Sequence, residues 1–188
     1  AGGVVMMNIH NGEIVALASS PDFNANKERG VLGKDKDSSI YFNRVVQGVY
    51  EMGSTFKIFS VAQGLEKDLF TLDSLIDTRA FRINSRKIED KYKFNSESSI
   101  YEIIVRSSNV GSARLALMVG EKGLKEIFSK LGLLEPVRLE LREANTTRPI
   151  LPKNWHDITL ATVSYGYGMS VSLLHLAKAY AILGNGGL

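Results

Sequence analysis

Two short apolar runs open the chain, with polar turn residues between them. Val4–Ile9 and Ile14–Ala18 have the length of strands, and Asn11-Gly12 is the residue pair that tight type I′ turns prefer. Both runs are nearly all apolar, which is typical of a sheet covered on both faces. The pattern therefore predicts a β-hairpin, which Pro21 ends directly after the second strand.

From Tyr41 onward the apolar spacing becomes mainly helical. Helices are predicted over 42–50, 54–69, 99–120 and 123–133, and over the last stretch, 171–187. The stretch 54–69 is apolar around most of its circumference, which indicates a central position in its domain. Ser172 is the predicted N-cap of the last helix, and Gly132 and Gly184 are predicted stop signals. A small hairpin is predicted to turn at Asn84-Ser85, and loops over 19–30 and 134–156.

Two strands followed mostly by helices predict an α+β fold. We expect a helical subdomain on an incomplete antiparallel sheet, whose other strands are not in this chain. A chain of 188 residues suits one domain, and its first residues already have a strand pattern, so residues 1–188 are expected to be part of a longer domain. The edge of the first hairpin is expected to be poorly ordered or to pair with another chain.

Composition excludes several classes of function. With 44% hydrophobic and 23% charged residues the chain is ordinary for a globular protein, and a net charge of +3 from scattered residues predicts no nucleic-acid partner. The absence of cysteine excludes disulfides, a cysteine nucleophile and thiolate metal sites. No apolar run is long enough to span a bilayer.

"GSTFK" places Ser54 three residues before Lys57 at the predicted start of a helix, where the two side chains share one face. A serine hydroxyl is a weak nucleophile without an adjacent base. Burial among apolar neighbours lowers the pKa of a lysine, so Lys57 could accept the proton of Ser54. The backbone N–H of Ser54 could then help to form an oxyanion hole.

The same tetrad has a structural interpretation, in which Ser54 is a plain N-cap and Lys57 a solvated lysine. Ser54 is the one serine of the chain with a lysine three residues later. Lys57 also lies in the most apolar predicted helix, where a solvated lysine is hard to place. Both observations favour the catalytic interpretation.

A second group of polar residues, "SSN", contains Ser107 and Asn109, where one predicted helix ends and the next begins. A hydroxyl here could relay a proton between Lys57 and a leaving amine, and an amide could hold a substrate carbonyl or the lysine. The alternative is that Ser107 or Ser108 only caps the second helix.

Other chemistries find little support in the chain. There is no Gly-x-Ser-x-Gly motif, and His10, His156 and His175 have no recognisable triad or metal spacing, so neither a metal nor a cofactor is predicted. His175 is expected to be a core or capping residue. Gly166 and Gly168 fit no phosphate loop and are expected to let the backbone turn tightly beside the active site.

Together, "EMGSTFKIFSVAQGLE", "SSNVGSARLALMVG" and "SYGYGMSVSLLHLAKAYAILGNGG" resemble, in this order, the transpeptidase domain of class B penicillin-binding proteins. The opening hairpin resembles the first hairpin of that domain, so the resemblance covers nearly the whole chain. Asn109 and the "SYGYGMSVS" stretch are most similar to the division-specific (septal) members, since elongation-specific members usually have Asp in place of Asn109.

The resemblance implies a serine acyltransferase with the penicillin-binding transpeptidase fold. Ser54 would attack the D-alanyl-D-alanine end of a peptidoglycan stem peptide and expel D-alanine, and an amine of a neighbouring stem would complete the cross-link. Lys57 would act as base, with Ser107 and Asn109 assisting, and penicillins would acylate Ser54. The family also implies an inner-membrane anchor, a periplasmic location, and a glycan polymerase and division proteins as partners.

The third motif of this family, Lys-Thr-Gly or Lys-Ser-Gly, is absent from the chain. We therefore expect residues 1–188 to be the N-terminal portion of one transpeptidase domain, inefficient alone as a catalyst and as a penicillin target. Two other functions stay open: a class D β-lactamase or β-lactam sensor, which shares the Ser-Thr-Phe-Lys tetrad, and a non-catalytic scaffold module of the same fold.

Overall fold

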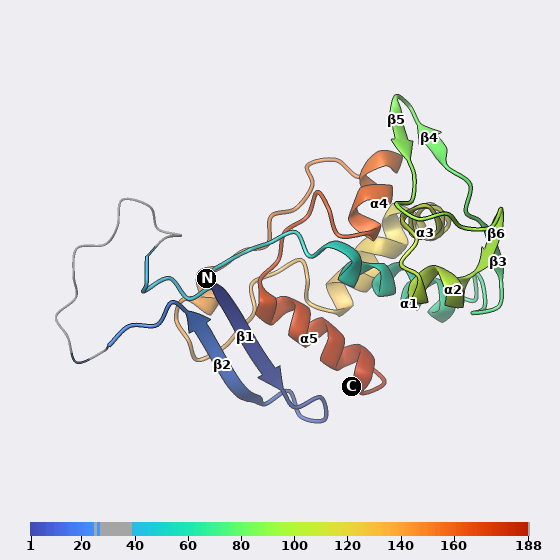
Figure 1. The fold of residues 1–188 in the computed structure, drawn as a ribbon. Coiled ribbons are helices and arrows are strands. Elements are labelled where there is room, and N and C mark those ends of the chain that lie inside the picture. The colour runs from blue at the N-terminus through green and yellow to red at the C-terminus, as the bar shows by residue number, and fades with distance from the viewer. Residues whose placement is uncertain (25, 27–38, 188) are drawn as a thin grey trace. The chain divides into compact units, whose positions relative to one another are not determined.

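The computed structural model describes residues 1–24, 26 and 39–187, which form two compact units (Figure 1). The hairpin unit combines three segments: Ala1–Tyr50, Leu131–Ile150 and Val171–Leu188. The helical unit combines Glu51–Lys130 with Leu151–Ser170. Residues 25 and 27–30 of the predicted loop over 19–30 lie outside the described residues. Within the described part, no helix has the length and apolar character needed to cross a membrane.

The predicted N-terminal hairpin is confirmed, as antiparallel strands β1 (Gly2–Met7) and β2 (Ile14–Ser20). The predicted two-residue type I′ turn is wrong, because residues 8–13 form a longer connection. Asn8 and Asn11 each accept, through the side chain, the backbone N–H two residues further on. Gly12 alone takes a positive φ there, of 73°.

One face of this hairpin packs on helix α5 (Leu173–Gly184), and these elements close the core of the hairpin unit (Figure 1). The buried residues of this core are Val45, Val46, Val137, Ala144 and Leu174. The opposite face exposes Val4, Met6 and Val15, each at about 60%. Coverage of both faces, which the apolar runs predicted, is thus not provided by the described part of this chain.

The N-terminus of α5 confirms the predicted cap. The Ser172 hydroxyl accepts the backbone N–H of His175, and the His175 ring is bonded back to Ser172 in a capping box. The other ring nitrogen of His175 lies 2.8 Å from the carbonyl oxygen of Glu135. Burial lowers the pKa of His175 below its usual value. His175 is therefore a core and capping residue, as expected.

The helix predicted over 42–50 is wrong. Gln47 N–H donates to the carbonyl of Asn43, which forms one helical turn, but Tyr50 then pairs in both directions with Val171 as an isolated β-bridge. The Asn43 and Gln47 side chains also bond to backbone N–H groups inside the turn, which competes with further helix.

The helical unit is built around two long helices, α1 (Lys57–Glu66) and α3 (Asn109–Lys130), which pack against each other. Shorter elements surround them: the 3₁₀ turn η2 (Gly53–Phe56), β3 (Leu75–Asp77), β4 (Phe81–Ile83), β5 (Arg86–Ile88), β6 (Glu97–Ser99), α2 (Ile100–Val105) and α4 (Asp157–Ser164). Strands β4 and β5 form the hairpin predicted at Asn84-Ser85, and β3 pairs with β6. In the hairpin unit, η3 (Ala144–Thr146) interrupts the predicted loop over 134–156.

Sequence patterns located most helices of this unit but not all of them. The predicted break near Gly120 is confirmed as a kink in α3, where Gly120 takes φ 72°. Gly132, at φ 69°, follows the end of α3 as predicted. Helix α4 was not predicted, because its sequence "DITLATVS" is rich in β-branched residues, which have low helix propensity.

Candidate active site

Ser54 lies in η2, one turn ahead of α1, and its side chain is exposed. The carbonyl of Ser54 accepts the backbone N–H of Lys57, so the 3₁₀ turn runs directly into the α-helix. The predicted position at the start of the most apolar helix is therefore confirmed. An exposed hydroxyl at this place can be reached by a large substrate.

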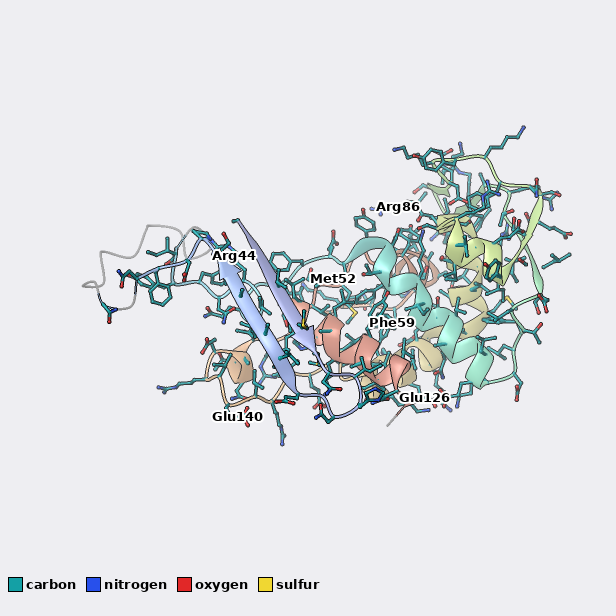
Figure 2. The ribbon with its side chains drawn as sticks, turned by 60° about the horizontal axis from the view of Figure 1, so that its bottom comes forward. Arg44, Met52, Phe59, Arg86, Glu126 and Glu140 are labelled. Carbon is teal, nitrogen blue, oxygen red and sulfur yellow. The ribbon has the colours of Figure 1, made fainter. Side chains whose placement is uncertain are left out.

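Lys57, in contrast, is only 3% exposed. It lies between Phe56 and Phe59, both fully buried, and Figure 2 labels Phe59 on α1. Burial lowers the pKa of Lys57 from 10.5 to about 8, while the charge of Asp90 acts in the opposite direction. About a tenth of the molecules then carry a neutral amine at pH 7. The alternative of a solvated lysine is wrong.

The Lys57 amine is bonded to Ser107. Its Nζ donates to the Ser107 hydroxyl at 2.8 Å and to the Ser107 carbonyl oxygen at 2.5 Å. Within the part of the chain that the structure describes, the Lys57 amine and the Ser54 hydroxyl share no hydrogen bond. The proton transfer from Ser54 to Lys57 therefore stays a prediction, while the link between the two motifs is direct.

Ser107 occupies the junction of α2 and α3, as predicted, with φ 60°. This left-handed conformation is unusual for a residue with a side chain. Two backbone bonds hold it: Ser107 N–H donates to Ile104, and Ser108 N–H donates to Ile103. The turn aims the hydroxyl and the carbonyl of Ser107 at the same amine.

Ser108, rather than Ser107, is the residue that caps α3. Its buried hydroxyl accepts the N–H of Gly111 at 2.8 Å and donates to the carboxylate of Asp90 at 2.6 Å. The two serines of "SSN" thus have different roles in the structure. Ser108 caps α3, and Ser107 contacts the lysine.

Asn109 is the first residue of α3 and is half-buried. Its backbone N–H donates to Asp90, and so does the N–H of Val110, at 3.2 Å. Among the described residues its side-chain amide has no hydrogen-bond partner. The amide is therefore available to a substrate.

The loop that carries Gly166 and Gly168 packs against the backbone ahead of Ser54. Gly53 N–H donates to the carbonyl of Gly166 at 3.1 Å, and Gly168 N–H donates to the carboxylate of Glu51 at 2.7 Å. Gly166 has φ 83°, and a Cβ added there would lie 2.0 Å from the Gly53 carbonyl oxygen. The expected tight turn is confirmed, it lies against Gly53 directly ahead of Ser54, and only glycine fits it.

All four predicted site residues belong to the helical unit, and the fold brings Lys57 and Ser107 into contact. Sequence reasoning missed two others, Asp90 and Glu51, and named Ser108 only as a possible cap. Asp90 follows β5 and lies 18 positions before Ser108, with no pattern in the sequence that links them. Glu51 lies 117 positions before Gly168. Only the folded chain places these residues at the site.

Comparison with known families supports the assignment of the fold. A family model described as "Penicillin binding protein transpeptidase domain" matches residues 2–188. "Probable peptidoglycan D,D-transpeptidase FtsI" of Caulobacter vibrioides is 40% identical over 184 residues, which cover 97% of this chain and 30% of that protein. "Peptidoglycan D,D-transpeptidase FtsI" of Escherichia coli K12 is 33% identical over 188 residues, 100% of this chain and 31% of that protein. The chain thus spans about a third of the length of these curated relatives.

Solved structures agree with this result. A peptidoglycan glycosyltransferase from Burkholderia ambifaria superposes with a TM-score of 0.81 at 28% identity, over 97% of this chain and 53% of that one. The transpeptidase domain of Burkholderia pseudomallei penicillin-binding protein 3 gives the same score and identity, over 97% of this chain and 50% of that one. The predicted α+β transpeptidase fold is confirmed.

Proposed function

The chain belongs to the penicillin-binding protein transpeptidase domain family, and we propose that Ser54 is the nucleophile of a serine-type peptidoglycan D,D-transpeptidase. The observation that carries this proposal is the state of Lys57. It is a buried amine one turn after Ser54, with a pKa lowered to about 8 and a direct bond to the Ser107 hydroxyl. A buried, partly neutral amine that is bonded to one hydroxyl and lies one turn after another serine has the chemistry of a general base.

The first half-reaction acylates the enzyme. The Ser54 oxygen attacks the carbonyl of the penultimate D-alanine of a stem peptide, while Lys57 accepts the hydroxyl proton. A C–O bond forms and the C–N bond to the terminal D-alanine breaks. The proton reaches the leaving amine through the Ser107 hydroxyl, which can donate and accept at once and lies 2.8 Å from the lysine.

The second half-reaction forms the cross-link. An amine of a neighbouring stem attacks the acyl-enzyme, loses a proton along the same route, and releases Ser54. The Ser54 N–H, in the first turn of the helix, stabilises the oxyanion in both halves. Asn109 orients the substrate through its side-chain amide. Penicillins, as mimics of the D-alanyl-D-alanine end, acylate the same serine.

The biological setting follows from the relatives and the motifs. Two of the relatives carry the name peptidoglycan D,D-transpeptidase FtsI, and the "SSN" and "SYGYG" stretches resemble the septal members. We infer a role in cell-wall synthesis at division, on the periplasmic face of the inner membrane, alongside a glycan polymerase and division proteins. Residues 1–188 are proposed to be the N-terminal portion of one transpeptidase domain, which agrees with their share of the relatives' length.

Labelling of the full-length gene product with a fluorescent penicillin tests the proposal. The label is expected on Ser54, located by peptide mass spectrometry, and Ser54→Ala is expected to abolish it. Ser85→Ala, at the exposed tip of the β4–β5 hairpin in the same unit, is the matched control and is expected to label normally. Labelling that persists in Ser54→Ala would overturn the assignment of the nucleophile.

Two further measurements separate the proposal from its alternatives. A class D β-lactamase hydrolyses its acyl-enzyme quickly, whereas a transpeptidase is expected to keep the penicilloyl group for many minutes. A scaffold module does not need its nucleophile, so cells that carry only Ser54→Ala would divide normally. Fast release of the label, or normal division, would refute the transpeptidase function.

A further inference from the structure

The carboxylate of Asp90 accepts hydrogen bonds from three consecutive residues, Ser108, Asn109 and Val110, at the start of α3. Oδ2 accepts the Ser108 hydroxyl at 2.6 Å, and Oδ1 accepts the N–H groups of Asn109 and Val110. These N–H groups belong to the first turn of α3, where no helical carbonyl is available to them. A carboxylate there also interacts favourably with the helix dipole. Asp90 therefore anchors the start of α3 to the segment that follows β5.

The anchored segment is also the one that meets the lysine. Ser107 precedes Ser108 directly and stands in a left-handed conformation, which its own side chain does not favour. If the start of α3 shifted, the Ser107 hydroxyl and carbonyl would leave the Lys57 amine together. An error of about 1 Å in such a contact is enough to slow catalysis on the order of 100-fold.

Asp90 also acts on Lys57 through its charge. The negative charge of Asp90 raises the pKa of Lys57, which opposes the effect of burial. The nearest acidic neighbour in sequence, Glu89, is exposed and paired with Lys87 instead. A base works best when its pKa lies near the working pH, so a carboxylate that offsets part of the burial is useful.

We propose that Asp90 is a positioning residue of the active site, which holds Ser107 against Lys57 through its bonds to Ser108 and to the start of α3. It touches neither substrate nor nucleophile. The proposal rests on the proposed function only for its kinetic consequence. The arrangement of Lys57 itself can be measured without turnover.

Two variants separate the charge of Asp90 from its bonds. Asp90→Asn keeps an oxygen for the two N–H groups but removes the charge. The acid limb of its pH–rate profile for acylation by penicillin is expected to lie at a lower pH than that of the wild type, by roughly half a pH unit. Ser108→Ala keeps the charge and removes one bond, so we expect a slower maximal rate, by about 10-fold, with the acid limb unmoved.

Glu89→Gln removes the same charge one residue earlier and is the matched control, expected to leave both rate and pH profile unchanged. All variants are made in the full-length gene product. Proteins labelled with ¹³Cε-lysine, with Lys57→Arg to assign the signal, report the titration of Lys57 by NMR whether or not the enzyme reacts. Asp90→Asn is expected to lower the pKa seen there.

The outcomes are distinguishable. If the Lys57 titration and the acid limb stay in place in Asp90→Asn, while rate falls only as far as stability does, Asp90 is merely structural and the proposal is wrong. If the Lys57 titration shifts but Ser54 never reacts with penicillin in the wild type, the action of Asp90 on Lys57 stands and the proposed function fails. A shift in Glu89→Gln equal to that in Asp90→Asn would also overturn the specific role of Asp90.

Discussion

Two of the helices that begin at a serine cap, α5 and α3, differ in the origin of the second partner of the capping serine. In α5, the Ser172 hydroxyl is bonded to His175, three residues later. In α3, the Ser108 hydroxyl accepts from Gly111 and donates to Asp90, a residue 18 positions earlier in the chain. One cap is closed within a single helical turn, and the other ties a helix to a distant strand end.

The difference shows what each cap can do. A local cap determines where a helix begins. In α5 the longer tie comes from the second ring nitrogen of His175, which lies 2.8 Å from the Glu135 carbonyl oxygen in the same unit. A long-range cap also sets the position of the residues just before the helix relative to a second element. In α3 those residues include Ser107, which contacts Lys57. The long-range cap therefore supports a site, whereas the cap of α5 only stabilises its unit.

The largest effect is expected from removing Lys57, the proposed base, which is bonded to Ser107 next to the long-range cap. Lys57→Met is expected to slow the acylation of Ser54 by about 10³-fold, because no other described group is bonded to Ser107 as the lysine is. Stability should not fall, since a buried charge is replaced by an apolar chain of similar length. Stopped-flow labelling with penicillin and urea unfolding measure the two quantities. If the loss of unfolding free energy were as large as the increase in the activation free energy of acylation, Lys57 would be structural.

The two buried bases next to the caps should also titrate differently. Between pH 8 and 10.5 the unfolded chain retains a proton that folded Lys57 has released, so the free energy of unfolding rises with pH, by about 3 kcal/mol in total. Lys57→Met should lack this rise, which the difference between the two unfolding curves reveals.

His175 acts at lower pH: its pKa is lowered, so the unfolded chain binds the proton more readily and stability falls below pH 6.5.

The contact between Gly53 and Gly166 is a second long-range support of the site. Gly166→Ala would place a Cβ 2.0 Å from the Gly53 carbonyl and should displace Ser54. We expect about 100-fold slower acylation and a loss of about 2 kcal/mol of stability. Gly120→Ala is the control, because Gly120 has a similar φ of 72° and no atom within 4 Å of the added Cβ. Equal acylation rates in the two variants would remove the argument for this contact.

The smallest effect is expected at the local cap. Ser172→Ala should cost about 1 kcal/mol of unfolding free energy, since one N–H of α5 loses its acceptor. Acylation of Ser54 should keep its wild-type rate and pH profile. Ser172→Asn, which can also cap, should restore most of the stability. A changed pH profile in Ser172→Ala would contradict the separation of roles between the two caps.

The elements that sequence patterns predicted correctly are those with local signals. The N-terminal hairpin, α1, the kink at Gly120 and the cap of α5 each follow from residues a few positions apart. The failures have local causes too. Side chains of Asn43 and Gln47 bond to backbone N–H groups that the helix predicted over 42–50 would need. In α4, β-branched residues lowered the helix propensity, so this helix was not predicted.

The site shows the same division. Ser54, Lys57, Ser107 and Asn109 were predicted as site residues because each pair lies within one turn of chain and carries residue types suited to acyl transfer. By itself the sequence determined which groups are available and which helix starts they occupy, since caps, turns and helical faces depend on neighbours. Tertiary structure alone decided that Lys57 is buried and that its amine contacts Ser107. It alone also decided that Asp90 is bonded to Ser108 and to the start of α3, directly after Ser107. Desolvation and charge depend on distances in space, and no spacing along the chain encodes them.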